Sequence, residues 1–136
     1  MTNHVSHSHK SRHSADAFWA VLGAFTEIDW LVGAGNYRVG EHEGRTARIL
    51  GMDTPIVEFL LGCDDERREL RYGVVKNPFV PVDNYQATVT VEPSDKGCLV
   101  HFNARFDLDE VPFDQVNQML TAAYQMMASR IDSELE

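Results

Sequence analysis

Apolar and polar residues alternate with a period of two through the middle of the chain, between Tyr37 and Leu108. This period is typical of half-buried β-strands. Turn-forming residues separate the runs, and Asp64-Asp65-Glu66 and Ser94-Asp95-Lys96-Gly97 have the composition of hairpin turns. The pattern therefore predicts antiparallel pairing. The predicted strands are Tyr37–Glu41, Thr46–Met52, Ile56–Cys63, Glu69–Lys76, Asn84–Glu92 and Cys98–Leu108.

The period becomes helical on both sides of this region. Ser14 offers an N-cap and Asp16 favours the first turn of a helix whose apolar positions include Phe18 and Trp19. A second short helix is predicted over Ile28–Leu31. After Pro112 the chain predicts one long helix. Its apolar stripe consists of Phe113, Val116, Leu120, Ala123, Tyr124, Met127, Ile131 and Leu135.

The segment Val5–His13, ahead of the first helix, predicts a first strand with three histidines at even spacing, His7, His9 and His13. No cysteine or carboxylate stands at ligand spacing beside them, so a solvated strand is favoured over a metal site. We expect no metal and no cofactor. Strand parity also divides the later runs, and we expect an inward face formed by Leu70, Tyr72, Val74, Tyr85, Ala87, Val89, Val91, Val100, Phe102, Ala104 and Phe106.

Length and charge narrow the class of protein. A chain of 136 residues suits one domain with one core, covering 1–136. The formal net charge of −9 argues against nucleic-acid binding and against an anionic membrane surface. No apolar run has the roughly 20 residues of a spanning helix, so we expect no membrane insertion and a cytoplasmic location. The two cysteines, Cys63 and Cys98, are interpreted as reduced thiols. Monomer and homodimer both stay open.

Glu58 is the most informative single residue, because it places a carboxylate within an otherwise apolar run, on the same face as Ile56 and Leu60. Two interpretations stay open. The carboxylate could line a pocket, where it could also act as a general base, or it could pair with Arg48 for structural reasons, since an unpaired buried charge is costly. Arg48 could likewise contact an anionic ligand group.

The order of these features resembles the START and birch-pollen-allergen-like (SRPBCC) superfamily, over nearly the whole chain. The resemblance is carried by Phe18-Trp19, Arg48, Glu58, the turn Asp64–Arg68, Tyr72, Asn84-Tyr85 and Phe102–Phe106. The chain is most similar to its polyketide cyclase/dehydrase-type members. The middle segment also resembles the plant abscisic acid receptors.

This resemblance implies an α+β helix-grip fold, in which a curved antiparallel sheet of about seven strands surrounds a long C-terminal helix and two short helices follow the first strand. It implies a cavity for an apolar small molecule. The loop Gly51–Pro55 corresponds to the receptors' gate, whereas Asn77–Val82 carries Phe-Val-Pro-Val in place of their latch. The inward lysine that holds the receptors' ligand has no counterpart here, so recognition of the same acid is not expected.

Two functional hypotheses follow. We favour a binding or carrier protein for a polyketide-, lipid- or hormone-like ligand over catalysis. The alternative is a polyketide cyclase/aromatase-like enzyme, in which Glu58 removes a proton while Tyr72, Tyr85 or Arg48 stabilises the enolate. The tyrosines could equally be ordinary core. The predicted ligand-binding residues are Arg48, Ile56, Glu58, Leu60, Tyr72, Val74, Tyr85, Phe102, Phe106, Val116, Leu120 and Tyr124.

Overall fold

A computed structural model of the chain describes residues 2–75 and 77–136. The sheet has seven strands, and every neighbouring pair is antiparallel. In spatial order they are β1 (Thr2–Ser11), β7 (Gly97–Leu108), β6 (Val82–Ser94), β5 (Glu69–Val74), β4 (Ile56–Asp64), β3 (Arg45–Leu50) and β2 (Tyr37–His42). The helices are α1 (Ala15–Leu22), α2 (Asp29–Val32) and α3 (Phe113–Glu134).

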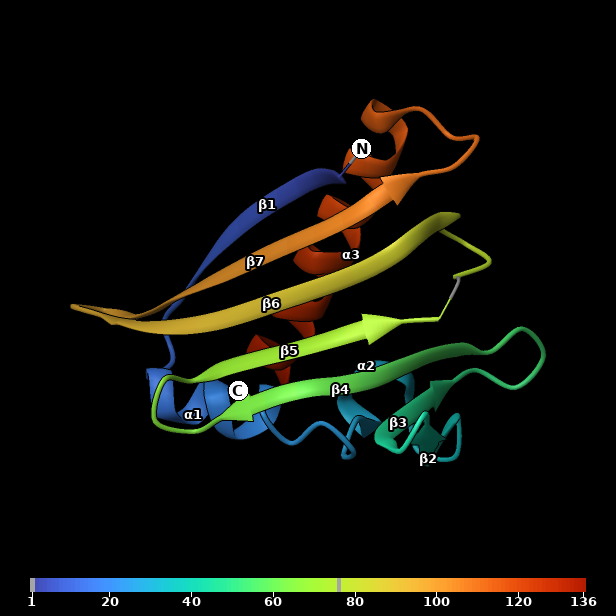
Figure 1. Cartoon of the computed structure of the whole chain (residues 1–136). Coiled ribbons are helices and arrows are strands. Elements are labelled where there is room, and N and C mark those ends of the chain that lie inside the picture. Colours follow the sequence, from blue (N-terminus) through green and yellow to red (C-terminus); the bar gives the residue numbers. More distant parts are fainter. Residues whose placement is uncertain (1, 76) are drawn as a thin grey trace.

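The strands β1 and β2 are consecutive in the sequence but form opposite edges of the sheet. The segment that carries α1 and α2 connects the two edges, and α3 crosses one face of the curved sheet (Figure 1). This is the predicted α+β helix-grip arrangement, which is confirmed. No helix of the described residues is both long enough and apolar enough to cross a membrane.

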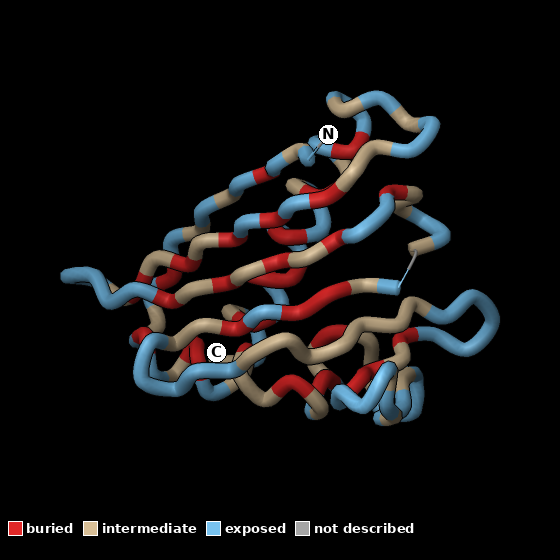
Figure 2. Tube along the Cα trace, viewed as in Figure 1, coloured by how far each residue is buried: buried red, intermediate tan, exposed pale blue. Residues whose placement is uncertain are grey.

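The period-two pattern correctly assigned the inward face. Buried and exposed residues alternate along β6 and β7 (Figure 2), and the side chains of Val89 and Val100 are fully buried. Because successive side chains of a strand point to opposite faces, one face packs on α3 while the other stays polar. The core therefore lies between the sheet and the helices.

Local sequence signals explain where the elements begin and turn. The Ser14 side chain caps α1 by accepting a hydrogen bond from the Ala17 backbone N–H at 3.1 Å. The Asp64 carboxylate accepts backbone N–H bonds within the β4–β5 turn. The α1 helix is then joined to that turn, because Trp19 donates its indole N–H to Asp65 at 2.9 Å.

Several predicted bounds shift by a few residues. The first strand ends at Ser11 rather than His13, and β6 is longer at both ends than predicted. The third strand ends at Leu50, before Gly51, whose φ of 90° is a conformation that glycine adopts readily. The predicted end of the fifth strand at Lys76 lies outside the described residues.

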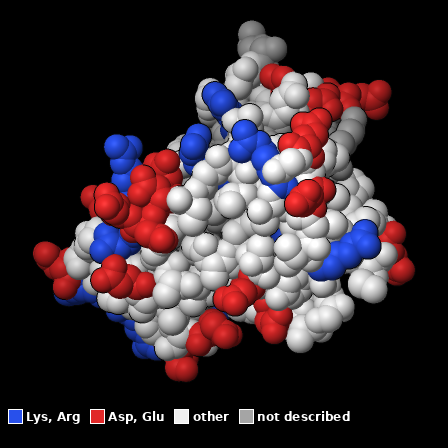
Figure 3. Space-filling model, turned by 60° about the horizontal axis from the view of Figure 1, so that its bottom comes forward, with Lys and Arg blue, Asp and Glu red and all other residues white. Residues whose placement is uncertain are grey.

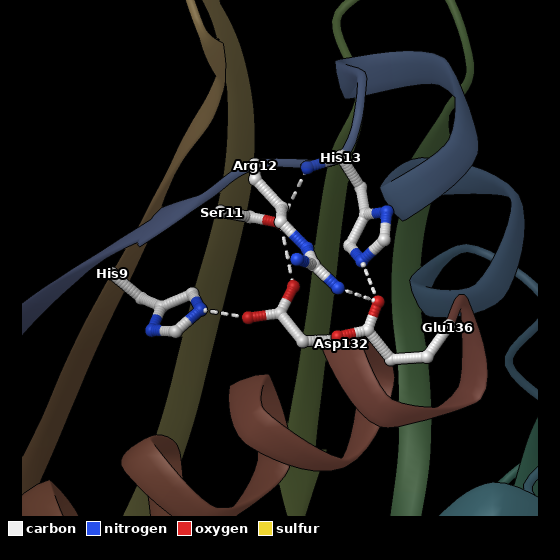
Figure 4. Close-up of polar contacts among 6 residues, drawn as sticks. All are labelled: His9, Ser11, Arg12, His13, Asp132 and Glu136. Carbon is white, nitrogen blue, oxygen red and sulfur yellow. Dashed lines mark hydrogen bonds and ion pairs between the residues drawn. The ribbon is translucent and has the colours of Figure 1, made fainter.

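A polar cluster connects the end of α3 to β1 and to the residues that follow β1 (Figure 4). It consists of His9, Ser11, Arg12, His13, Asp132 and Glu136. His9 and Ser11 contact the two carboxylate oxygens of Asp132 at 2.7 and 2.5 Å, while Arg12 and His13 both contact Glu136. The predicted solvated strand is therefore wrong for His9 and His13, whose side chains are only 20% and 17% exposed. No cluster of metal ligands is found in residues 2–75 and 77–136.

Candidate functional site: a cavity between the sheet and the C-terminal helix

A cavity of about 580 Å³ lies between the inward face of the sheet and the C-terminal half of α3. Its volume is within the range of about 300–1,000 Å³ that is usual for small-molecule sites. Most of the wall is apolar and comes from α2, α3, β4, β5 and β6. Asp53, Thr54, Phe79 and Met126 line it and are exposed, so they mark its mouth.

Seven of the predicted ligand-binding residues line this cavity, namely Ile56, Glu58, Tyr72, Val74, Tyr85, Leu120 and Tyr124. The other five are absent from its wall. Phe102, Phe106 and Val116 are almost completely buried in the core, Leu60 packs against that core, and Arg48 lies behind the wall with 1% of its surface exposed. Strand parity and helical spacing predict the direction of a side chain, but not whether it borders empty space.

Stacked aromatic rings explain why the other part of the helix–sheet interface is filled. Phe102 stacks on Tyr124 with a centroid separation of 4.9 Å, and Phe106 lies between Tyr85 and Phe113 at 6.5 Å from each. These rings pack β6 and β7 against α3 and fill that part of the interface. The cavity is therefore confined to the part of the interface that adjoins α2, the β3–β4 loop and the β5–β6 loop.

Three tyrosine side chains from different elements converge on the cavity, Tyr72 on β5, Tyr85 on β6 and Tyr124 on α3. The hydroxyl groups of Tyr85 and Tyr124 are in hydrogen-bonding contact. Burial raises the pKa of all three phenols above the ordinary value, and the Glu58 carboxylate raises it further. The phenols therefore stay neutral, and each can donate a hydrogen bond or accept one.

Glu58 and Arg48 are direct cross-strand partners on β4 and β3. Arg48 donates its Nε–H to Glu58 Oε1 at 2.7 Å and an Nη1–H to the Phe25 carbonyl oxygen at 3.1 Å. Its guanidinium carbon lies 4.2 Å from the Phe25 ring centroid and 5.6 Å from that of Tyr72. Both predicted roles of Glu58 are thus geometrically compatible, because the carboxylate lines the cavity and also neutralises a buried cation.

Sequence reasoning did not identify the contributions of α2 and of Arg130. Leu31 and Val32 of α2 line the cavity, as does Arg130 near the end of α3. Arg130 follows Met127 by three residues, and this helical spacing from the predicted apolar stripe was an available signal. The gate-like loop was signalled by the family resemblance, and Gly51, Asp53 and Thr54 of that loop do line the cavity.

Comparison with known proteins places this architecture in a family. Residues 2–136 match a protein family described as polyketide cyclase / dehydrase and lipid transport. The chain belongs to this family. The resemblance to the START and birch-pollen-allergen-like superfamily, inferred from the order of the sequence features, is thereby confirmed. No match to the chain was found among curated proteins.

Several solved structures have a fold similar to that of this chain. The protein XoxI from Bacillus cereus is 25% identical, with a TM-score of 0.82 over 96% of this chain and 94% of that one. Norcoclaurine synthase from Thalictrum flavum, in complex with dopamine and hydroxybenzaldehyde, is 20% identical, with a TM-score of 0.76 over 99% and 87%. Ara h 8.0201 is 14% identical, with a TM-score of 0.76 over 98% and 97%. The last two likenesses concern the fold.

Proposed function

We propose that this protein binds a small hydrophobic molecule, of the polyketide, lipid or hormone type, in the cavity between the sheet and α3. The observation that supports this most strongly is an apolar cavity of about 580 Å³ in which three neutral tyrosine hydroxyl groups converge. Apolar walls supply affinity through surface removed from water, and a few polar groups orient the ligand. The lipid-transport part of the family description agrees with this role.

The aromatic character of the wall favours a flat or unsaturated ligand. Rings of Tyr72, Tyr85 and Tyr124 border the cavity, and aromatic pairs gain stability in offset-stacked or edge-to-face contact. A ligand carbonyl or hydroxyl oxygen could take a hydrogen bond from one of these phenols. The norcoclaurine synthase complex, which has the same fold, contains two small aromatic molecules and gives independent support for this ligand type.

Catalysis by a cyclase-like mechanism is the second candidate, and it depends on Glu58. The carboxylate faces the cavity beside neutral phenols, which is the arrangement that abstraction of an acidic C–H proton would need. However, Glu58 Oε1 is already held by the buried guanidinium of Arg48. We therefore favour binding, with Glu58 serving chiefly to neutralise Arg48.

The binding proposal is tested by filling the cavity from α3. Ala123 lines the cavity, whereas the neighbouring Ala122 does not, and both side chains are exposed. Ala123→Trp and Ala122→Trp are therefore a matched pair with the same change in helix propensity. Calorimetric titration with a panel of aromatic ketones and fatty acids should show binding to the wild type and to Ala122→Trp. The affinity of Ala123→Trp for the same compounds should be lower by at least about tenfold.

The same panel separates the two candidates. Turnover of a poly-β-ketone mimic by the wild type, lost in Glu58→Gln while binding is kept, would favour the enzyme. If no compound binds the wild type, or if both tryptophan variants bind as well as the wild type does, the cavity is not the binding site that we propose.

A further inference from the structure

Arg130 is the only basic residue of the described cavity wall. It lies near the C-terminal end of α3, and its side chain is exposed at the mouth. Its Nη1–H donates a hydrogen bond to the carbonyl oxygen of Leu31 in α2. That contact uses one of the five N–H donors of the guanidinium.

The charge of Arg130 has no counterion within residues 2–75 and 77–136. None of the ion pairs of those residues includes Arg130, although the 21 Asp and Glu residues of the chain outnumber its 12 Lys and Arg residues. Acidic side chains are prominent on the face drawn in Figure 3. Within the same residues Arg38, Arg45 and Arg105 also have no ion pair, but none of them lines the cavity, so Arg130 is the unpaired cation of the described cavity wall.

The other charged groups of the wall define what can approach Arg130. Glu58 is neutralised by Arg48, and Asp53 lies in the loop at the mouth. The interior beyond them presents neutral phenols and apolar side chains. A second charge placed deep in the cavity would lose its hydration without gaining a partner. A charge on the ligand is favourable only at the mouth, where it stays partly in water.

We propose that the occupant of this cavity is an apolar carboxylic acid whose carboxylate is held at the mouth by Arg130. This inference rests on the proposed function and specifies the ligand class. The guanidinium fork matches the two oxygens of a carboxylate, and a partly hydrated pair avoids most of the desolvation cost. Asp53 repels the same carboxylate and so directs it towards α3. The apolar body, aliphatic or aromatic, extends inward along Tyr124 and Leu120.

Matched probes isolate the contribution of the carboxylate. Decanoic acid is compared with decanamide, and 2-naphthoic acid with 2-naphthamide, by isothermal titration at fixed salt. In each pair the apolar body is the same and only the charge differs. The two pairs also decide between an aliphatic and an aromatic body. The proteins are wild type, Arg130→Gln, Arg130→Lys, Asp53→Asn and the control Arg105→Gln, whose arginine contacts Gln86 outside the cavity.

The expected result is a preference of the wild type for the acids. Arg130→Gln should weaken binding of the acids by about five- to thirty-fold and leave the amides within about twofold. Arg130→Lys should give an intermediate affinity because it keeps the charge without the fork. Asp53→Asn should strengthen binding of the acids, and Arg105→Gln should change neither class.

The remaining outcomes overturn either this inference or the function on which it rests. If each acid and its amide bind the wild type equally, or if Arg130→Gln weakens both classes alike, the carboxylate inference fails while the binding cavity stands. Unchanged amide binding in Arg130→Gln shows that the variant is folded with an intact cavity. If neither acids nor amides bind the wild type, the inference and the proposed function fail together.

Discussion

Replacing Glu58 by leucine tests whether the cross-strand pair of β3 and β4 depends on mutual neutralisation. The side chain of Arg48 is 1% exposed and that of Glu58 is 15% exposed, so Glu58→Leu leaves a guanidinium in the core without its counterion. Loss of one partner of a buried ion pair typically costs about 3–5 kcal/mol. We expect about 3 kcal/mol, because Arg48 keeps its bond to the Phe25 carbonyl and its contacts with two rings.

The double variant Arg48→Met with Glu58→Leu should recover part of this loss. Apolar replacement of a whole buried pair is often close to neutral, and the unpaired Phe25 carbonyl oxygen then leaves a deficit of about 1–2 kcal/mol. Arg48→Met alone should cost about 2 kcal/mol, since the Glu58 carboxylate still reaches water. The coupling energy of the cycle is then about 3–4 kcal/mol in magnitude, at or just above the upper end for contacting pairs.

The assay is urea unfolding followed by tryptophan fluorescence and far-UV circular dichroism, with thermal unfolding as a second measurement. A loss of about 3 kcal/mol should lower Tm by about 10 °C for a chain of this size. Arg105→Met is the control, because that arginine is exposed and contacts Gln86 on the outer face. It should change stability by less than about 0.5 kcal/mol. A cost below about 1 kcal/mol for Glu58→Leu, or additive single effects, would refute the reasoning.

Three further predictions concern the turn, the tyrosines and the end of α3. Gly97→Ala should destabilise the fold by at least about 2 kcal/mol in urea unfolding, because φ is 152° and the new Cβ would overlap the backbone at the end of β1; an unchanged midpoint would contradict this. Tyr124→Phe should cost about 1–3 kcal/mol, since it leaves the buried Tyr85 hydroxyl without its partner, and a neutral effect on Tm would show that the contact is dispensable. Arg12 lowers the pKa of Glu136. The stabilisation from their ion pair at the end of α3 is therefore fully present above the ordinary carboxyl pKa, and it is lost as pH falls through the lowered pKa of Glu136. Hydrogen exchange in the last turn should therefore show less protection at acidic pH, beyond the intrinsic change in exchange rate, and Arg12→Gln should reduce this pH dependence, with His13 left as the second group that lowers the pKa of Glu136.

The sequence predicted the elements and the inward faces because both depend on local periodicity. Alternation in β6 and β7 needs only the backbone geometry of a strand, and the stripe of α3 needs only the helical period. The burial of two alanines of α3 shows the limit of prediction from periodicity. Ala123 was placed in the apolar stripe but is exposed at the cavity, whereas Ala128, which was not placed in it, is fully buried. The helical period fixes the position of each residue around the axis, but the curvature of the sheet decides which of those positions are covered.

Contacts between distant segments could not be predicted from periodicity. His9 contacts Asp132, which is 123 residues away, and no local pattern connects the two side chains. The same holds for Arg130 and Leu31, which are separated by 99 residues. Such contacts require the sheet to bring β1 and α2 to the same, C-terminal end of α3, and this is a property of the closed fold.

The sequence by itself determined which side chains face the interior, but it left the pairing of Glu58 with Arg48 as one of two interpretations, and the register of β3 and β4 decided it. Only the tertiary structure decided which of those inward side chains border empty space. Phe102, Phe106 and Val116 fill the interface, whereas Tyr72, Tyr85 and Tyr124 border a cavity. Parity specifies a direction from the strand, but the distance to the opposing helix is set by how all the side chains of the core pack together.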